Sequence, residues 1–94
     1  MSKRYPEIDT VNLTEADGEY YYVFPAHTKS IILQTRTGEP FRYAYRTGDI
    51  ALERYITAHR GIAKMEDLMD REEVTVIYFS CSSAGEIMEV EFYR

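Results

Sequence analysis

Few side chains in this sequence are of kinds that do chemistry, and their spacing brings none of them together. His27 and His59 lie in the turn-like stretches PAHTK and TAHRG and form no HxH or HxxxH pair of the sort that binds a metal. Cys81 is the only cysteine, so no intrachain disulfide or thiolate cluster can form, and its place at the end of an apolar strand is typical of a buried thiol. Gly61 and Gly85 are isolated and make no phosphate-binding loop. We therefore expect no catalytic residue, no metal and no cofactor.

Two alternating stretches separate charged side chains from apolar ones. In EIMEVEFY, Glu89 and Glu91 share the face opposite the apolar residues, which favours an exposed acidic stripe over a catalytic carboxylate pair. In FRYAYR, Arg42 and Arg46 alternate with the aromatic residues, whereas a base-stacking surface needs arginine and aromatic rings on one face. We expect the aromatic residues Phe41, Tyr43 and Tyr45 in the core, the two arginines available to a protein partner, and no nucleic-acid binding.

Length and charge narrow the class of protein. Ninety-four residues make one domain with a small core, a limitation that oligomerisation commonly offsets. The start MSKRYPEIDT lacks an apolar signal-peptide core, and no apolar run reaches about 18 residues, so we expect neither secretion nor membrane insertion. The net charge of −5 is divided as −3 over residues 1–28, +4 over 29–64 and −6 over 65–94. This asymmetry suits either contact between complementary faces of neighbouring subunits or a mixed-charge soluble surface.

The elements that must hold these residues are short strands. Runs rich in aromatic and β-branched residues, separated by glycine and proline turns, are EYYYVF, SIILQTR, FRYAYR, the weaker LERYITA, VTVIYFSC and EIMEVEFYR. We expect one hairpin across TGEP and a last hairpin turned at Ala84–Gly85. Residues 62–70 are predicted as a helix or as a strand through Met65 followed by an acidic loop, and the second is favoured.

These strands predict an all-β fold. We expect a compact antiparallel β-sandwich or jelly-roll-like barrel of six to eight short strands over residues 20–94. Residues 1–19 are polar, lack sustained periodicity and end in a turn at Asp17–Gly18, so they are predicted to form an extended N-terminal arm.

Aromatic residues exceed what a core of this size can hide. The chain has nine tyrosines, and tyrosine and arginine are enriched in protein–protein interfaces. We expect a homo-oligomer, with the acidic stripe facing an arginine such as Arg42 or Arg46 of an adjacent subunit. The candidate interface residues are Tyr21, Ile32, Arg36, Arg42, Arg46, Tyr78, Glu89 and Glu91.

The order of these stretches resembles the small β-sandwich virion structural proteins of tailed bacteriophages. Their pattern is a proline-containing entry, an L-x-I-Q-x-R strand, a G-x-x-I-R-x-A return, a Y-x-x-x-x-x-G turn and a closing L-Y-F-x-S-x-x-A-G-x-x-x-E-x-x-x-Y segment. The matching residues here, within 23–94, are Pro25, Ile31, Leu33, Gln34, Arg36, Gly38, Phe41, Arg42, Ala44, Tyr55, Gly61, Ile77, Tyr78, Phe79, Cys81, Ala84, Gly85, Glu89 and Tyr93. The chain departs from the pattern by extra residues around DIALER and MDREE and by Cys81 in place of a serine.

The resemblance implies a virion protein made in the host bacterial cytoplasm. It implies a non-enzymatic capsid decoration or cement protein that binds the major capsid protein or other virion proteins, most often as a trimer. A neck, collar or tail-adaptor role on the same fold stays open. Two other classes also stay open: a free cytoplasmic protein-binding β module, and a small cupin-like enzyme, which the scarcity of histidines disfavours.

Overall fold

Eight strands make up the fold. The computed structural model describes residues 6–65 and 73–93. The strands are β1 (Glu7–Leu13), β2 (Tyr20–Phe24), β3 (Ser30–Thr35), β4 (Phe41–Ala44), β5 (Ile56–Ala58), β6 (Ile62–Met65), β7 (Thr75–Cys81) and β8 (Glu86–Tyr93). The described residues form no helix, and hence none long and apolar enough to cross a membrane. The all-β class expected from the sequence is confirmed.

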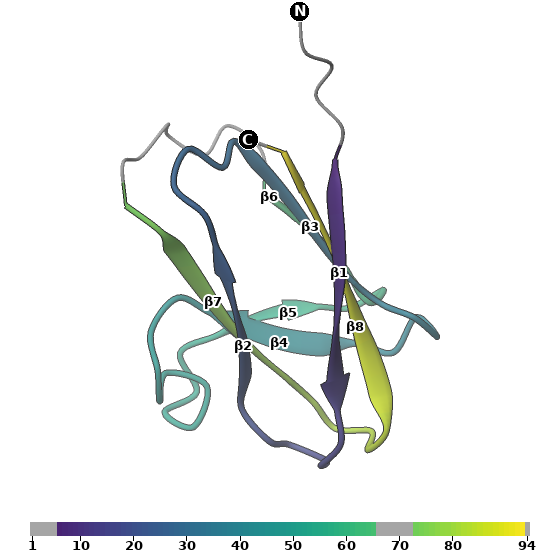
Figure 1. Ribbon diagram of the computed structural model, residues 1–94. Coiled ribbons are helices and arrows are strands. Elements are labelled where there is room, and N and C mark those ends of the chain that lie inside the picture. The colour runs from purple at the N-terminus through teal and green to yellow at the C-terminus, as the bar shows by residue number, and fades with distance from the viewer. Residues whose placement is uncertain (1–5, 66–72, 94) are drawn as a thin grey trace, which may run out of the picture.

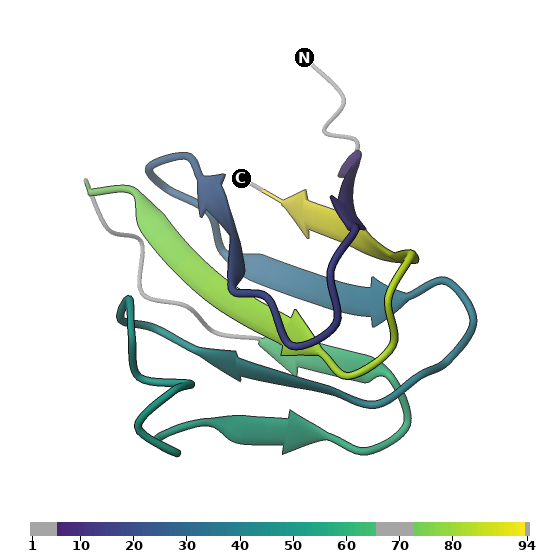
Figure 2. The same ribbon diagram turned by 90° about the horizontal axis from the view of Figure 1, so that it is seen from below.

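The strands pair into two four-stranded antiparallel sheets. One sheet has the order β1-β8-β3-β6 and the other β2-β7-β4-β5. Eight antiparallel strands in this order wind as two Greek keys into a jelly roll. Figures 1 and 2 show the two sheets as the layers of a sandwich, with the long β4–β5 connection reaching out at one end.

The core lies between the sheets and is built by strict alternation. Alternate residues of each strand point to the same face, so one set of apolar residues from each strand meets the opposite sheet. The core consists of Leu13, Phe24, Ile31, Leu33, Phe41, Ala58, Ala63, Met65, Ile77, Phe79, Cys81, Met88, Val90 and Phe92. Alternation in the sequence assigns inward positions in the 30–36, 74–81 and 86–94 stretches, and the structure confirms them: Ile31, Leu33, Ile77, Phe79, Met88 and Val90.

Two expected hairpins are absent, because their strands lie in different sheets. The connection 36–40 leads from β3 in one sheet to β4 in the other, and residues 82–85 likewise lead from β7 to β8 (Figure 2). Alternation identifies the inward face of a strand, but both sheets turn such a face to the same core. Four residues can span about 13 Å, which exceeds the spacing of about 10 Å between packed sheets. A short glycine turn therefore does not distinguish a hairpin from a crossing between sheets.

The segment expected as an N-terminal arm contributes an edge strand. β1 pairs with β8 along its whole length, from Glu7 opposite Phe92 to Leu13 opposite Glu86. Only Leu13 is fully buried, and Val11 packs partly against the core. The other inward positions of β1 carry acidic residues, so the alternation that marks a strand in the sequence is missing here. Pairing with β8 orders the segment instead.

Three other stretches differ in detail from the sequence expectation. β6 ends at Met65, as the strand alternative predicted; the rest of the 62–70 prediction falls on residues 66–70, outside the described residues. The weak LERYITA strand is reduced to β5. β4 ends at Ala44, so Tyr45 is exposed rather than part of the core face, while Phe41 is buried and Tyr43 packs against the core.

Candidate interaction surfaces

The eight candidate interface residues divide between opposite sides of the sandwich. On the outer face of the β1-β8-β3-β6 sheet, or directly after β3, lie Ile32, Arg36, Glu89 and Glu91. On the outer face of the β2-β7-β4-β5 sheet lie Tyr21, Arg42 and Tyr78, and Arg46 follows in the β4–β5 connection. The residues chosen from the sequence therefore lie on two separate surfaces. A single flat partner cannot contact both surfaces at once.

The first surface is organised in rows across the strands. One row runs from Ile8 through Glu91 and Ile32 to Lys64. The next row runs Thr10, Glu89, Gln34, Ile62. We name this surface the isoleucine–glutamate face, which comprises Ile8, Thr10, Ile32, Gln34, Arg36, Ile62, Lys64, Glu89 and Glu91. It contains a shallow depression of about 310 Å³.

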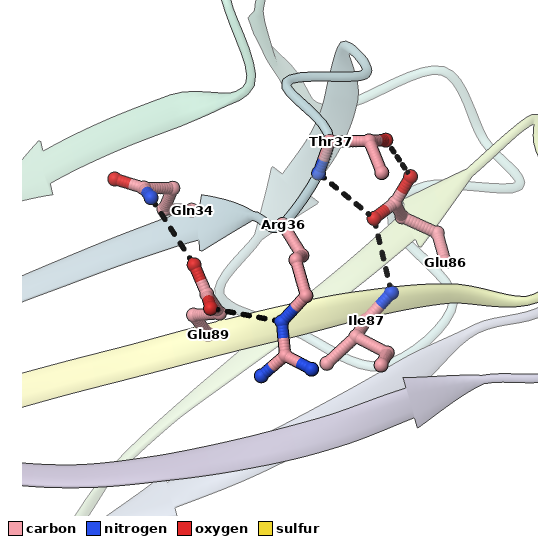
Figure 3. A network of polar contacts seen from close by, with 6 residues as sticks. All are labelled: Gln34, Arg36, Thr37, Glu86, Ile87 and Glu89. Carbon is pink, nitrogen blue, oxygen red and sulfur yellow. Dashed lines mark hydrogen bonds and ion pairs between the residues drawn. The ribbon is translucent and has the colours of Figure 1, made fainter.

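Glu89 is held in place by its own chain. Gln34 Nε2 donates to Glu89 Oε1 at 3.1 Å, and Arg36 Nε donates to Glu89 Oε2 at 3.0 Å (Figure 3). The acidic stripe of Glu89 and Glu91 was expected to face an arginine of a neighbouring subunit. In the structure, Glu89 already forms an ion pair with Arg36 of the same chain. Glu91 makes no hydrogen bond or ion pair with another residue of the described ranges, so its carboxylate is available to a partner.

Beside this network, Glu86 fastens the start of β8 to the β3–β4 connection. Its Oε1 accepts from the backbone N–H groups of Thr37 at 3.3 Å and Ile87 at 3.1 Å, and its Oε2 accepts from the Thr37 hydroxyl (Figure 3). Glu86 is only 7% exposed. The Thr37 hydroxyl and the backbone donors lower the pKa of the Glu86 carboxyl, against the opposing effect of its burial. Sequence reasoning passed over Glu86, although an acidic residue at an inward position of an alternating strand is a usable signal.

The second surface is more apolar. Tyr21 lies opposite Tyr78, with ring centroids 5.9 Å apart, and Val23 lies opposite Val76. Tyr21 is 60% exposed and Val23 46% exposed, and Val74 continues the exposed apolar surface beyond β7. We name these five residues the tyrosine–valine face. Contiguous exposed apolar groups of this kind mark interaction surfaces more often than isolated ones.

Arg42 is satisfied within the chain rather than projecting toward a partner. Its guanidinium donates to Asp17 Oδ1 at 2.6 Å and to Ser80 Oγ at 3.3 Å, and lies 5.6 Å from the centroid of the Tyr55 ring. These groups line a depression of about 410 Å³ under the β4–β5 connection, which Glu19 fastens by accepting from Gly48 N at 2.9 Å. The sequence hid this cluster because its members come from four separate segments.

The side chains that could act in catalysis or bind a metal lie far from one another. Both histidines are exposed in connections between strands. The Cys81 thiol is buried and lies 3.5 Å from the carbonyl oxygen of Pro40. Within residues 6–65 and 73–93, no group of three or more histidine, cysteine or acidic side chains could hold a metal ion. In those ranges every buried side-chain nitrogen or oxygen has a hydrogen-bond partner.

Comparisons with protein-family models, with curated proteins and with solved structures found no match to this chain. The described residues form an all-β jelly roll with two differently built outer faces. A fold of this kind serves many functions, so the function has to be argued from these faces.

Proposed function

We propose that this chain is a non-enzymatic structural subunit that binds other proteins through the isoleucine–glutamate face. More narrowly, we propose a capsid decoration protein of a tailed bacteriophage, made in the bacterial cytoplasm and bound to the major capsid protein as a homo-oligomer. The observation that carries the proposal is the arrangement of that face, in which isoleucines alternate with charged groups and one carboxylate, that of Glu89, is held at a defined position.

The apolar part of this face supplies affinity. Ile8 is 72% exposed and Ile62 44% exposed, and Ile32 lies half-buried between their strands. Burying one such side chain against a partner contributes about 1.5–3 kcal/mol, so two or three can support a specific complex. Interfaces generally combine an apolar centre with polar groups around it.

The charged part supplies orientation. The Gln34–Glu89–Arg36 network holds one carboxylate in a defined place before any partner arrives, which lowers the entropy lost on binding. Glu91 and Lys64 flank Ile32 on either side and carry opposite charges. A partner with the complementary arrangement is bound in one orientation, because reversing it juxtaposes like charges.

The virion assignment rests on fold and on resemblance. Viral capsid proteins include double-sheet jelly rolls, the topology found here. The stretches that resemble phage structural proteins coincide with β3, β4, β7 and β8, which contribute residues to both outer faces. Since the same fold also occurs in lectins and cupins, the particle itself must provide the test.

The test is association with phage particles. Mass spectrometry of purified virions of the encoding phage is expected to find the chain at high copy number, and purified protein is expected to co-sediment with empty capsid shells. Absence from virions together with no co-sedimentation overturns the proposal and favours a free cytoplasmic binding module. Recovery only with isolated necks or tails favours the adaptor role instead.

A matched pair of variants tests the assigned face. Ile8→Glu places a charge on the isoleucine–glutamate face, and Leu52→Glu places one on an equally exposed leucine, 65% exposed, in the β4–β5 connection. Ile8→Glu removes an isoleucine that the partner would bury, and is expected to weaken capsid binding roughly ten- to a hundredfold. Leu52→Glu is expected to bind as the natural protein does. Equal weakening by both variants argues against this face as the contact.

A further inference from the structure

Four strands lie at the edges of the two sheets, and three of them are protected. Edge strands expose unpaired backbone groups, and proteins usually blunt them with charges or by keeping them short. β1 carries Glu7 and Asp9, β6 carries Lys64, and β5 has only three residues. β2 has five residues with the sequence YYYVF and no charge, proline or glycine. It is the unprotected edge among the four.

The backbone of β2 has a free side. β2 pairs with β7, and no other backbone hydrogen bond of the described residues involves residues 20–24. Its contact with β1 includes a side-chain hydrogen bond from the Tyr22 hydroxyl to Asp9 Oδ2, 2.9 Å long, which leaves the backbone groups of the edge unpaired. The exposed Tyr21 and Val23 flank this edge, so it continues directly into the tyrosine–valine face.

A second copy of the same chain fits this edge best. In an antiparallel pair of identical strands related by a two-fold axis, each charge near the axis meets its own copy, which is unfavourable. β1 and β6 would bring like charges together in this way, and β2 brings none. A different partner would gain from a charged edge, because charge complementarity adds specificity. The absence of charge on β2 therefore removes the repulsion that would oppose self-pairing.

We propose that two copies of this protein associate by antiparallel pairing of β2 with β2. All five residues pair only if Tyr22 lies opposite Tyr22 of the second copy, which places Tyr21 opposite Val23 of the second copy. The two β2-β7-β4-β5 sheets become one continuous sheet, and the two tyrosine–valine faces become one apolar band. This two-fold pair differs from the trimer that the phage resemblance implies, and it stands whether or not the protein belongs to a virion.

The stoichiometry of the purified full-length protein is the first test. Sedimentation equilibrium is expected to give twice the chain mass of 11.0 kDa. Tyr21→Lys puts a positive charge on the edge that meets its own copy's edge, and is expected to weaken the dimer at least tenfold. Leu52→Lys, the control, is expected to leave it unchanged. A monomeric or trimeric natural protein, or a Tyr21→Lys variant as dimeric as the natural one, overturns the proposal.

Disulfide trapping tests the register without depending on a destabilised variant. Residues directly opposite in antiparallel strands bring their Cβ atoms within about 5 Å, whereas diagonal neighbours lie about 7–8 Å apart, beyond disulfide geometry. Mild oxidation of Tyr21→Cys mixed with Val23→Cys is therefore expected to give cross-linked dimers, and either variant alone only a little. The native Cys81 is buried and does not compete. Equal cross-linking of the mixture and of each variant alone, or none in the mixture, contradicts this pairing.

Discussion

Removal of the Glu86 carboxylate should be among the most damaging single changes outside the apolar core. Glu86→Ala deletes three hydrogen bonds and leaves the N–H groups of Thr37 and Ile87 without their acceptor. Hydrogen bonds to a charged group contribute about 1.5–3 kcal/mol each, but the buried carboxylate also costs desolvation that alanine does not. We expect a net loss of about 3 kcal/mol from a free energy of unfolding of roughly 5–14 kcal/mol for a chain of this length.

Glu86→Gln should destabilise the protein much less than Glu86→Ala, because the two carboxylate oxygens accept hydrogen bonds from different kinds of donor. Both backbone N–H groups donate to Oε1, and only the Thr37 hydroxyl donates to Oε2. An amide keeps the first oxygen and places NH2 at the second, and the threonine hydroxyl can rotate from donor to acceptor. We expect a loss of about 1 kcal/mol at neutral pH.

The same substitution predicts a pH dependence. Folding lowers the pKa of Glu86, so at acidic pH the unfolded chain binds more protons than the folded one. The stabilisation is complete above the unfolded value of about 4.3 and is lost as the pH falls through the folded value. The difference in free energy of unfolding between the natural protein and Glu86→Gln should therefore shrink as the pH falls.

Urea denaturation of the natural protein, Glu86→Ala and Glu86→Gln at several pH values measures both effects. Thr37→Ser, which keeps the hydroxyl, is the matched control and should lose little. A Glu86→Ala loss below about 1 kcal/mol would mean that water replaces the carboxylate, and a gap between natural protein and Glu86→Gln that does not change with pH would refute the assigned pKa shift.

Three further predictions concern other parts of the fold. Gly61→Ala, at φ 74° with the new Cβ 2.5 Å from Thr35 Oγ1, should lose about 3 kcal/mol or more in urea denaturation, and Gly38→Ala, at φ 85° in open space, only about 1 kcal/mol. Burial and Asp9 raise the pKa of Tyr22 to about 12, so folding favours the protonated form of this side chain. The free energy of unfolding should therefore fall as the pH rises from about 10 toward 12, and it should fall less in Tyr22→Phe. Urea denaturation at each pH measures both. A thiol reagent should modify the buried Cys81 only at the rate of unfolding, and fast labelling of the folded protein would contradict its burial.

Alternation in the sequence predicted which face of a strand points inward, but it did not predict which strands pair with one another. The inward positions of the 74–81 and 86–94 stretches were read correctly because period-2 patterning depends only on which side of a strand meets the core. The hairpins were wrong because sheet membership depends on which strands pair, and that information is spread over the whole chain. β1 was missed because acidic residues occupy two of its four inward positions.

The candidate surfaces show the same division. Parity placed Glu89 and Glu91 together on an outward face and Ile32 on the outward face of another strand, and the structure brings the three side by side. The internal partners of Glu89 and Arg42 were not predictable, since Gln34 is 55 residues from Glu89 and Asp17 is 25 residues from Arg42. Partners that far apart are brought together only by the fold.

The strand order also governs when the protein can fold as it is synthesised. β8 lies between β1 and β3, and β7 lies between β2 and β4, so the last two strands made occupy the middle of both sheets. Until residues 75–93 have left the ribosome, only the β3–β6 and β4–β5 pairs are available, and β1 and β2 have no partner. We therefore expect no stable intermediate before residues 75–93 have emerged and a single slow step once they have, as distant pairings generally require. During that interval the uncharged β2 strand is exposed, which makes it the segment that chaperones have most reason to cover.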